Sequence, residues 1–235
     1  MLKLDSFQTA LFVNNLNLDN KLKIASDIVS INKGIFNGEP VILPIPLKAQ
    51  PEIPRIIVKS KDEKYSCNVG LNRVDLFFNL KDKKEQFWDI IRGEYLDILL
   101  PIVSFMKENY NVLINRIGFI SNLSLILNES SNDYIIHKYM KEGGLISGTY
   151  DLQIHALNKI DLADEIKANR WLRIITTRSI SQPDNDKCLV ISIDINSDPD
   201  VPRNFDIELI RRFFSSTIEH IKDLMEQHYG ENLLC

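Results

Sequence analysis

The feature that most constrains this chain is the order in which its hydrophobic periods change along the sequence. Alternation typical of a strand, a short amphipathic stretch, several further strands and a long amphipathic helix follow one another up to about residue 110. Much the same order then repeats. The sequence therefore predicts an α+β fold of two similar halves, residues 1–110 and 111–235, which share one continuous core.

In the first half, prolines recur between Pro40 and Pro54. Because proline has no N–H, this segment is expected to form an edge strand or an extended surface crossing. Pro101 lies inside the long helical pattern and is expected to kink that helix or divide it in two. The other predicted elements are a strand at 7–14, a helix from Asp19 to Gly34, meander strands at 55–59, 65–69 and 73–80, and the long helix at 82–108.

The second half predicts one long strand at 112–127, with a bulge at Gly118. The rest of this half is predicted as a short helix at 134–141, strands at 149–157, 170–180 and 187–195, and a closing helix at 206–228. In each half an antiparallel meander is followed by a long amphipathic helix, and this order resembles the TATA-binding-protein-like architecture.

Two segments carry a family resemblance. Residues 71–79, read as Leu-Asn-Arg-Val-Asp-Leu-Phe-Phe-Asn, and residues 115–122, read as Asn-Arg-Ile-Gly-Phe-Ile-Ser-Asn, follow a strand that contains proline. This pattern resembles a sporadically distributed bacterial family of uncharacterised proteins of similar length. The resemblance implies a bacterial origin and a defence-related or toxin-related gene setting, and it brings no catalytic residue with it.

Charge and composition indicate a cytoplasmic protein. The net charge is −4 and the charged residues of both signs are interspersed, so no global field attracts nucleic acid or an anionic membrane, although a local basic patch is compatible with this charge. No apolar run is long enough to span a membrane, and no membrane contact is expected. The cysteines, Cys67, Cys188 and Cys235, are far apart and are expected to be reduced.

The sequence contains no motif whose spacing dictates a reaction. The histidines are dispersed, and the glycine-rich segment 143–148 lacks the Lys-Ser/Thr of a phosphate loop. The acidic alternation from Asp194 to Asp200 lacks the glycine of a calcium loop and has Phe205 where the last ligand belongs. We therefore predict no catalytic residue, no metal site and no cofactor.

The candidate binding residues lie on predicted strands. Alternation places Arg73 and Asn79 on one face of their strand, and Arg116 and Asn122 on one face of theirs. If these strands were neighbours, the side chains would line a polar surface able to bind a carboxylate, a phosphate or a partner's backbone; alternatively, the arginines pair with acids such as Asp75. A second basic strand carries a stacking aromatic, and its residues are Arg170, Trp171, Arg173 and Arg178.

Three functions remain open. The leading hypothesis is a non-catalytic binding or regulatory subunit that engages a protein partner or a second copy of itself. The alternative is binding of nucleic acid or a nucleotide through the strand arginines. The third is an enzyme with a pocket between the two halves, which would require convergent groups with shifted pKa values.

Overall fold

The fold is seen in a computed structural model that describes residues 2–14, 16–32, 34–46, 48–80, 91–140, 151–163, 166–176, 187–201 and 203–229. Its strands are β1 (Leu2–Val13), β2 (Val41–Ile42), β3 (Ile56–Lys59), β4 (Tyr65–Val69), β5 (Arg73–Asn79), β6 (Ile114–Ile126), β7 (Gln153–Leu162), β8 (Ile166–Thr176) and β9 (Cys188–Ser197). Its helices are α1 (Lys21–Ile31), the π-helical turn η1 (Ile91–Tyr95), α3 (Leu96–Tyr110), α4 (Ser131–Tyr139) and α5 (Ile207–Tyr229). The α+β class predicted from the sequence is confirmed.

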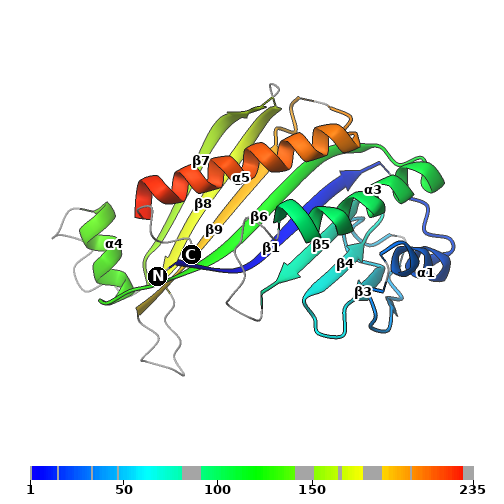
Figure 1. The fold of residues 1–235 in the computed structure, drawn as a ribbon, viewed down its shortest axis with the longest axis horizontal. Helices are drawn as coiled ribbons and strands as arrows, with labels where there is room; N and C mark the ends of the chain where they lie inside the picture. Colours follow the sequence, from blue (N-terminus) through cyan, green and yellow to red (C-terminus); the bar gives the residue numbers. More distant parts are fainter. Residues whose placement is uncertain are drawn as a thin grey trace.

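The described strands form one antiparallel sheet in the order β2-β3-β4-β5-β1-β6-β9-β8-β7. The strands β1 and β6 pair at its centre over almost their whole length, from Leu2 opposite Leu125 to Val13 opposite Ile114. The meander of β3, β4 and β5 lies on one side of this pair, and β9, β8 and β7 lie on the other (Figure 1). This order is the one a duplicated unit would give, and the division at residue 110 stays a prediction.

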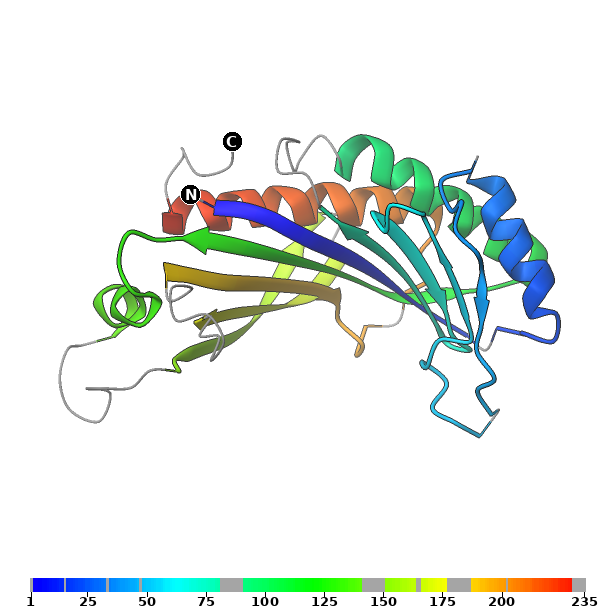
Figure 2. The same cartoon turned by 90° about the horizontal axis from the view of Figure 1, so that it is seen from below.

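The sheet is arched, and its two long helices lie on the convex side (Figure 2). Helix α5 crosses the strands of the second half, whereas α3 lies over those of the first half and α1 lies at the far end of the arch beside α3 (Figures 1 and 2). No described helix crosses the middle of the concave side. Among the described elements, the helices therefore cover the convex side and leave the middle of the concave side to the strands.

Aromatic side chains hold the helices to the convex side. Phe7 of β1 stacks on Phe78 and meets the edge of Tyr95, with ring centroids 4.5 Å apart in both pairs. Phe119 of β6 packs edge-on against Phe214 of α5 at 5.5 Å. Because Phe7 and Phe119 also touch across the central strand pair, these contacts join the two halves in one buried cluster.

Local sequence signals mark where the helices begin and end. The Asn20 side chain accepts a hydrogen bond from the Lys23 N–H at the start of α1, and Ser130 accepts one from the Asp133 N–H at the start of α4. Gly34 follows α1 with a φ of +82°, a conformation that glycine adopts without strain. These local signals explain why the helix limits lie near those predicted.

The proline-rich segment before β3 is organised by a buried arginine. Prolines supply carbonyl groups without N–H groups, so the segment has more acceptors than donors. The fully buried Arg55 side chain donates from Nη1 to the Ile53 carbonyl at 2.8 Å and to the Pro51 carbonyl at 3.3 Å. One short edge strand, β2, forms in this segment, as the prolines predicted.

Four predictions about the elements need correction or limitation. Helix α3 continues through Pro101, so the proline does not divide it. Gly118 pairs regularly with Ala10 and Asn196, and the irregularities of the β1–β6 pairing lie between Leu4 and Ser6 and between Phe12 and Val13. Strand β7 begins four residues later than predicted. The first part of the predicted helix at 82–108 lies outside the described residues.

Candidate functional site

The candidate site is the concave face of the sheet, which we call the open face. Cross-strand register shows which side chains share it: on β1 they are Ser6, Gln8, Ala10 and Phe12, which alternate with buried residues that face the helices. Every residue directly opposite these on β5 and β6 points to the same side of the sheet. The predicted faces of the two arginine strands are thereby confirmed, but the two strands are separated by β1.

One row of the open face places an aromatic ring between two arginines. Phe12 lies opposite Arg73 on β5 and opposite Arg116 on β6. The Cζ atoms of Arg73 and Arg116 lie 5.1 and 4.3 Å from the centroid of the Phe12 ring. At these distances the ring attracts both guanidinium groups, and it holds two like charges near each other. We call Arg73, Phe12 and Arg116 the Arg–Phe–Arg row.

Arg73 is paired with a carboxylate of its own strand. Its Nε lies 2.9 Å from each Asp75 oxygen, and its Nη2 lies 2.8 Å from Asp75 Oδ1. Gln8 Nε2 also donates to Asp75 Oδ1, at 2.7 Å. The predicted pairing of Arg73 with Asp75 is confirmed, so Arg73 has less capacity for a ligand than its charge suggests.

Arg116 is held in a different way. Its Nη2 donates to Asn196 Oδ1 at 3.1 Å, and Asn196 in turn donates to Asp194 Oδ1 at 3.1 Å. Its buried Nε has no hydrogen-bond partner. Burial lowers the pKa of Arg116, opposed by nearby Asp194, yet a guanidinium stays charged at neutral pH. Arg116 therefore keeps a cationic group whose hydrogen-bonding capacity is only partly used.

The asparagines form a second row on the same face. Ser6 lies opposite Asn79 on β5 and opposite Asn122 on β6, and Asn122 Nδ2 donates to Ser6 Oγ at 3.1 Å. Ser6 and Phe12 are six positions apart in β1, which corresponds to about 20 Å along an extended strand. The structure thus brings Arg73, Arg116, Asn79 and Asn122 to one surface, at its two ends.

The arginines of β8 are separated by the sheet. Arg170 faces the helices, where its Nη1 lies 3.0 Å from His220 Nε2 of α5. Because a guanidinium can only donate, His220 accepts through Nε2, and burial followed by the Arg170 charge lowers the pKa of this histidine. Arg173 lies three positions after Arg170, so it points to the opposite side of the sheet, which is the open face. Its side chain is exposed there. Arg178 lies outside the described residues.

Trp171 extends the open face toward the edge of the sheet. It is half-buried and lies opposite Asp194 on β9 and opposite Leu157 on β7. Leu157 is 50% exposed. The sequence prediction included Trp171 but missed Phe12 and Leu157. For Phe12 the signal was the alternation of Gln8, Ala10 and Phe12, which becomes informative only when the neighbours of β1 are known.

The open face carries more cationic than acidic side chains, although the whole chain is acidic. By register its basic residues are Lys3, Lys59, Arg73, Arg116, Lys159, Lys167 and Arg173. Its strand carboxylates by register are Asp75, Asp161 and Asp194. Asp5 accepts a hydrogen bond from Ser124 of this face, and Asp198, which follows β9, is paired with Lys159 at 3.1 Å. Several are paired, as in the 3.0 Å contact of Lys167 with Asp161. The face is therefore mixed in sign with a cationic excess.

Other kinds of site find less support in the described part of the chain. There, no group of three or more histidine, cysteine, aspartate or glutamate side chains is placed to hold a metal ion. None of the described helices combines the length and the apolar character needed to cross a membrane. Two surface hollows are lined only by residues between Ile31 and Pro101, so neither lies between the predicted halves.

Comparisons with known proteins add little to this geometry. No family model and no curated protein matches the chain. A solved structure of a rolling circle replication initiator protein from Geobacillus stearothermophilus is similar at a TM-score of 0.37 and 10% identity, over 97% of this chain and 86% of that one. A likeness this low supports no statement about function. The family resemblance of residues 71–79 and 115–122 stays a prediction.

Proposed function

We propose that this protein is a non-catalytic binding protein and that its ligand is a single strand of nucleic acid lying on the open face. The observation that carries the proposal is the Arg–Phe–Arg row, set on the concave side of an arched sheet with Trp171 and Arg173 on the same side. Such a surface combines the two contacts that single strands require, cations for phosphates and aromatic rings for bases.

The details of the row favour a phosphate ligand at Arg116. Its guanidinium is half-buried and bonded to an amide, and no carboxylate hydrogen-bonds to it in the described structure. A phosphate oxygen would therefore meet an arginine that need not first break an ion pair. Arg73, which is bound by Asp75, instead holds the Phe12 ring in place.

An unpaired strand suits this face better than a duplex. Stacking on Trp171 requires a base whose ring is free, and bases in a duplex are stacked on one another. The cationic excess of the face is also moderate, and this fits a ligand held by several weak contacts. We expect binding that depends little on sequence, because stacking and phosphate contacts read no base edges.

A protein partner is the second candidate, and one observation favours it. Strand β7 is the last strand of the sheet, and its Leu157 is half exposed beside Trp171. An extended segment of a partner could pair with such an edge and cover both side chains. In a cell extract, this candidate predicts a stoichiometric protein on the tagged chain that is lost when Leu157 is changed to Lys.

Fluorescence anisotropy with labelled single-stranded DNA and RNA of about 20 nucleotides tests the proposal. Affinity should fall steeply as salt rises from about 50 to 200 mM. Arg116→Ala should weaken binding and reduce the slope of log K against log salt by about one. Trp171→Ala should weaken binding by roughly 5- to 150-fold, the range for loss of one stacked base.

Arg211→Ala is the matched control, because Arg211 is an exposed arginine on α5 and its loss changes the net charge equally. It should leave binding nearly unchanged. Binding that is insensitive to salt, or that falls equally in the Arg211 and Arg116 variants, would remove the open face from consideration.

A further inference from the structure

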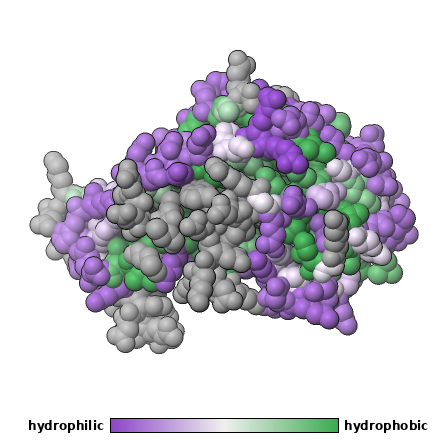
Figure 3. Space-filling model, in the orientation of Figure 1, coloured by the Kyte–Doolittle hydropathy of each residue, from purple (hydrophilic) through white to green (hydrophobic). Residues whose placement is uncertain are grey.

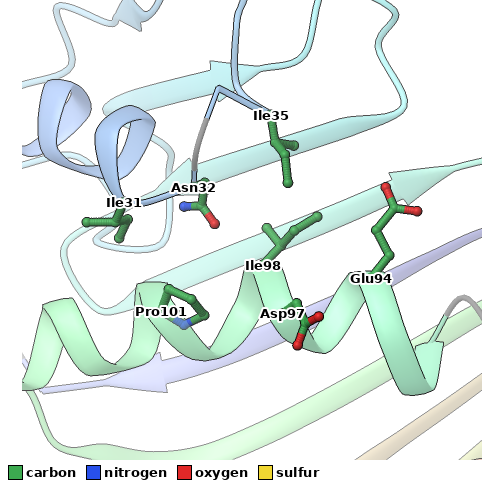
Figure 4. Close-up of a pocket in the computed structure, with 7 residues that line it drawn as sticks. All are labelled: Ile31, Asn32, Ile35, Glu94, Asp97, Ile98 and Pro101. Carbon is green, nitrogen blue, oxygen red and sulfur yellow. The ribbon is translucent and has the colours of Figure 1, made fainter.

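We propose that the cavity between α1 and α3 binds a primary aliphatic ammonium group. The cavity has a volume of about 470 Å³, within the range of small-molecule sites. It lies outside the open face, in the first half of the chain. Its lining residues, shown in Figure 4, are Ile31, Asn32, Ile35, Glu94, Asp97, Ile98 and Pro101.

The cavity has an apolar side and an acidic side. Ile31 and Ile35 come from the end of α1 and the turn after it, and Ile98 lies across from them on α3 (Figure 4). Glu94 and Asp97 extend from the turn η1 and the first turn of α3. Apolar surface is also visible on this side of the molecule in Figure 3. A ligand with a hydrocarbon body and a positive end would match both sides.

A buried acceptor at the cavity points to a hydrogen-bond donor. The Asn32 side chain is only 3% exposed, and its Nδ2 donates to the Ile28 carbonyl at 2.9 Å. Its Oδ1 has no hydrogen-bond partner, a costly state for a buried polar atom. In Figure 4 this oxygen is directed toward the space between Ile31 and Ile98. A ligand that donates a hydrogen bond would relieve this cost.

Helix α3 contributes a further acceptor. Pro101 has no N–H, so the Asp97 carbonyl lacks the hydrogen bond that the residue four positions later normally gives. Asp97 has no ion pair in the described structure. The cavity therefore offers carboxylate, amide and carbonyl oxygens, and one of the two Asn32 Nδ2 hydrogens is already bonded to the Ile28 carbonyl. An ammonium group carries three donors and no acceptor, which is the complementary set.

Glu94 indicates where such a ligand would enter. Its carboxylate lies 3.4 Å from Lys64 Nζ and is half exposed. It also lines a neighbouring hollow of about 350 Å³, together with Lys64 and Ile35. The long, partly exposed contact with Lys64 leaves Asp97 as the stronger partner for an incoming cation. Glu94 and Asp97 are both exposed at the rim of the cavity, and the buried Asn32 lies beneath them.

The same ammonium chemistry has two sources, a free alkylamine and the lysine side chain of another protein. Titration of the isotope-labelled full chain, followed by two-dimensional NMR, separates them by using n-pentylamine in one arm and Nα-acetyl-lysine amide in the other. Saturation by pentylamine alone would indicate a free amine. Saturation by both, with tighter binding of the lysine derivative, would indicate a lysine side chain.

The neutral isostere 1-pentanol and three variants complete the test. Pentylamine should shift resonances of the lining residues, and 1-pentanol should bind at least about tenfold more weakly, since a hydrogen bond to a charged group exceeds one tenfold step in affinity. Asp97→Asn and Asn32→Leu should each weaken amine binding by about tenfold or more. The control Asp223→Asn, an exposed acid of α5, should leave it unchanged.

Equal binding of pentanol and pentylamine would overturn the proposal, as would unchanged amine binding in both cavity variants. Far-UV circular dichroism and unfolding by urea show whether each variant is folded. If Asn32→Leu does not fold, Asp97→Asn still decides the question. Binding of the oligonucleotide should be unaffected in Asp97→Asn, so failure of this proposal and failure of the proposed open-face function can be told apart.

Discussion

At the scale of single residues, the two arginines of the Arg–Phe–Arg row should have different roles. Removing Arg73 leaves Asp75, which is only 7% exposed, without its cation and with Gln8 as its remaining side-chain partner. Such a loss is costly, so we expect Arg73→Ala to lower the free energy of unfolding by about 2–4 kcal/mol. Arg116→Ala should cost about 1 kcal/mol, because it removes one hydrogen bond to an amide.

Urea unfolding and oligonucleotide anisotropy of both variants check this difference. The double variant Arg73→Ala with Asp75→Ala should recover part of the lost stability, since it removes the uncompensated charge together with its former partner. The opposite order of stabilities, with Arg116→Ala the less stable protein, would contradict the assignment of Arg73 as the positioning residue.

Cys67 gives a prediction about alkaline pH. Burial raises the pKa of its thiol from 9.0 to about 12. The folded state therefore binds this proton more tightly than the unfolded state, and the resulting stability is present below pH 9 and is lost as the pH rises from 9 toward 12. The full loss corresponds to roughly 4 kcal/mol, because each pKa unit is worth about 1.4 kcal/mol.

The variant Cys67→Ala isolates this contribution. It should be less stable than the parent at pH 7, because it leaves space in the core, but its stability should fall less between pH 9 and 10.5. Tyr95 and Tyr229, whose pKa values burial also raises, are present in both proteins and cancel in the comparison. Equal pH slopes of the free energy of unfolding would show that Cys67 ionises as readily folded as unfolded.

At the scale of elements, α3 is expected to be strained by its proline. Pro101 lies inside a continuous helix and withholds one hydrogen bond from Asp97. Pro101→Ala should restore that bond and raise the free energy of unfolding by about 1–3 kcal/mol. The same change should weaken amine binding, because the Asp97 carbonyl would no longer be a free acceptor. Thermal unfolding and the pentylamine titration measure the two effects, and a loss of stability would show that packing of the proline ring outweighs the missing bond.

The helices and the meander strands were predictable because their signals are local. The alternating pattern and its flanking turn residues predicted the bounds of β4 as they are observed. The apolar face of the closing helix predicted the bounds of α5 to within one residue at each end. The bulge predicted at Gly118 is wrong because a glycine in a strand does not by itself indicate a bulge: Gly118 pairs regularly with both neighbouring strands, and a Cβ added there would meet the Asn196 Cβ at 3.4 Å, an ordinary contact. Strand alternation also implies that Arg170 and Arg173 point to opposite sides of the sheet, but the sequence prediction placed them in one binding group.

The remaining features depend on strand order, which no local pattern encodes. Phe12 lies between two arginines because β1 lies between β5 and β6, a pairing that joins segments more than sixty residues apart in the sequence. The cavity at Asn32 likewise requires α1 and α3 to pack side by side. The strand face of each arginine could therefore be predicted from the sequence. The residues that the arginines contact depend on the pairing of the central strands.

At the scale of the whole molecule, the central pair β1–β6 determines whether either half can fold alone. Residues 1–110 would leave β1 without β6, and residues 111–235 would leave β6 without β1. Each fragment would also expose part of the aromatic cluster, since Phe119 packs on Phe7 and Phe214 packs near Tyr95. An unpaired apolar strand at the edge of a sheet promotes aggregation.

We therefore expect each fragment alone to be unfolded or aggregated, and the two mixed in equal amounts to assemble into a native-like complex. Far-UV circular dichroism and size-exclusion chromatography of the separate and mixed fragments measure this. In the intact chain, tryptophan fluorescence, which comes from Trp88 and Trp171, and circular dichroism should follow one urea transition, because the buried cluster is continuous. Two separate transitions, or a fragment 1–110 that folds alone, would mean that the meander with α1 and α3 is an independent domain and that pairing across β1 and β6 only joins two finished units.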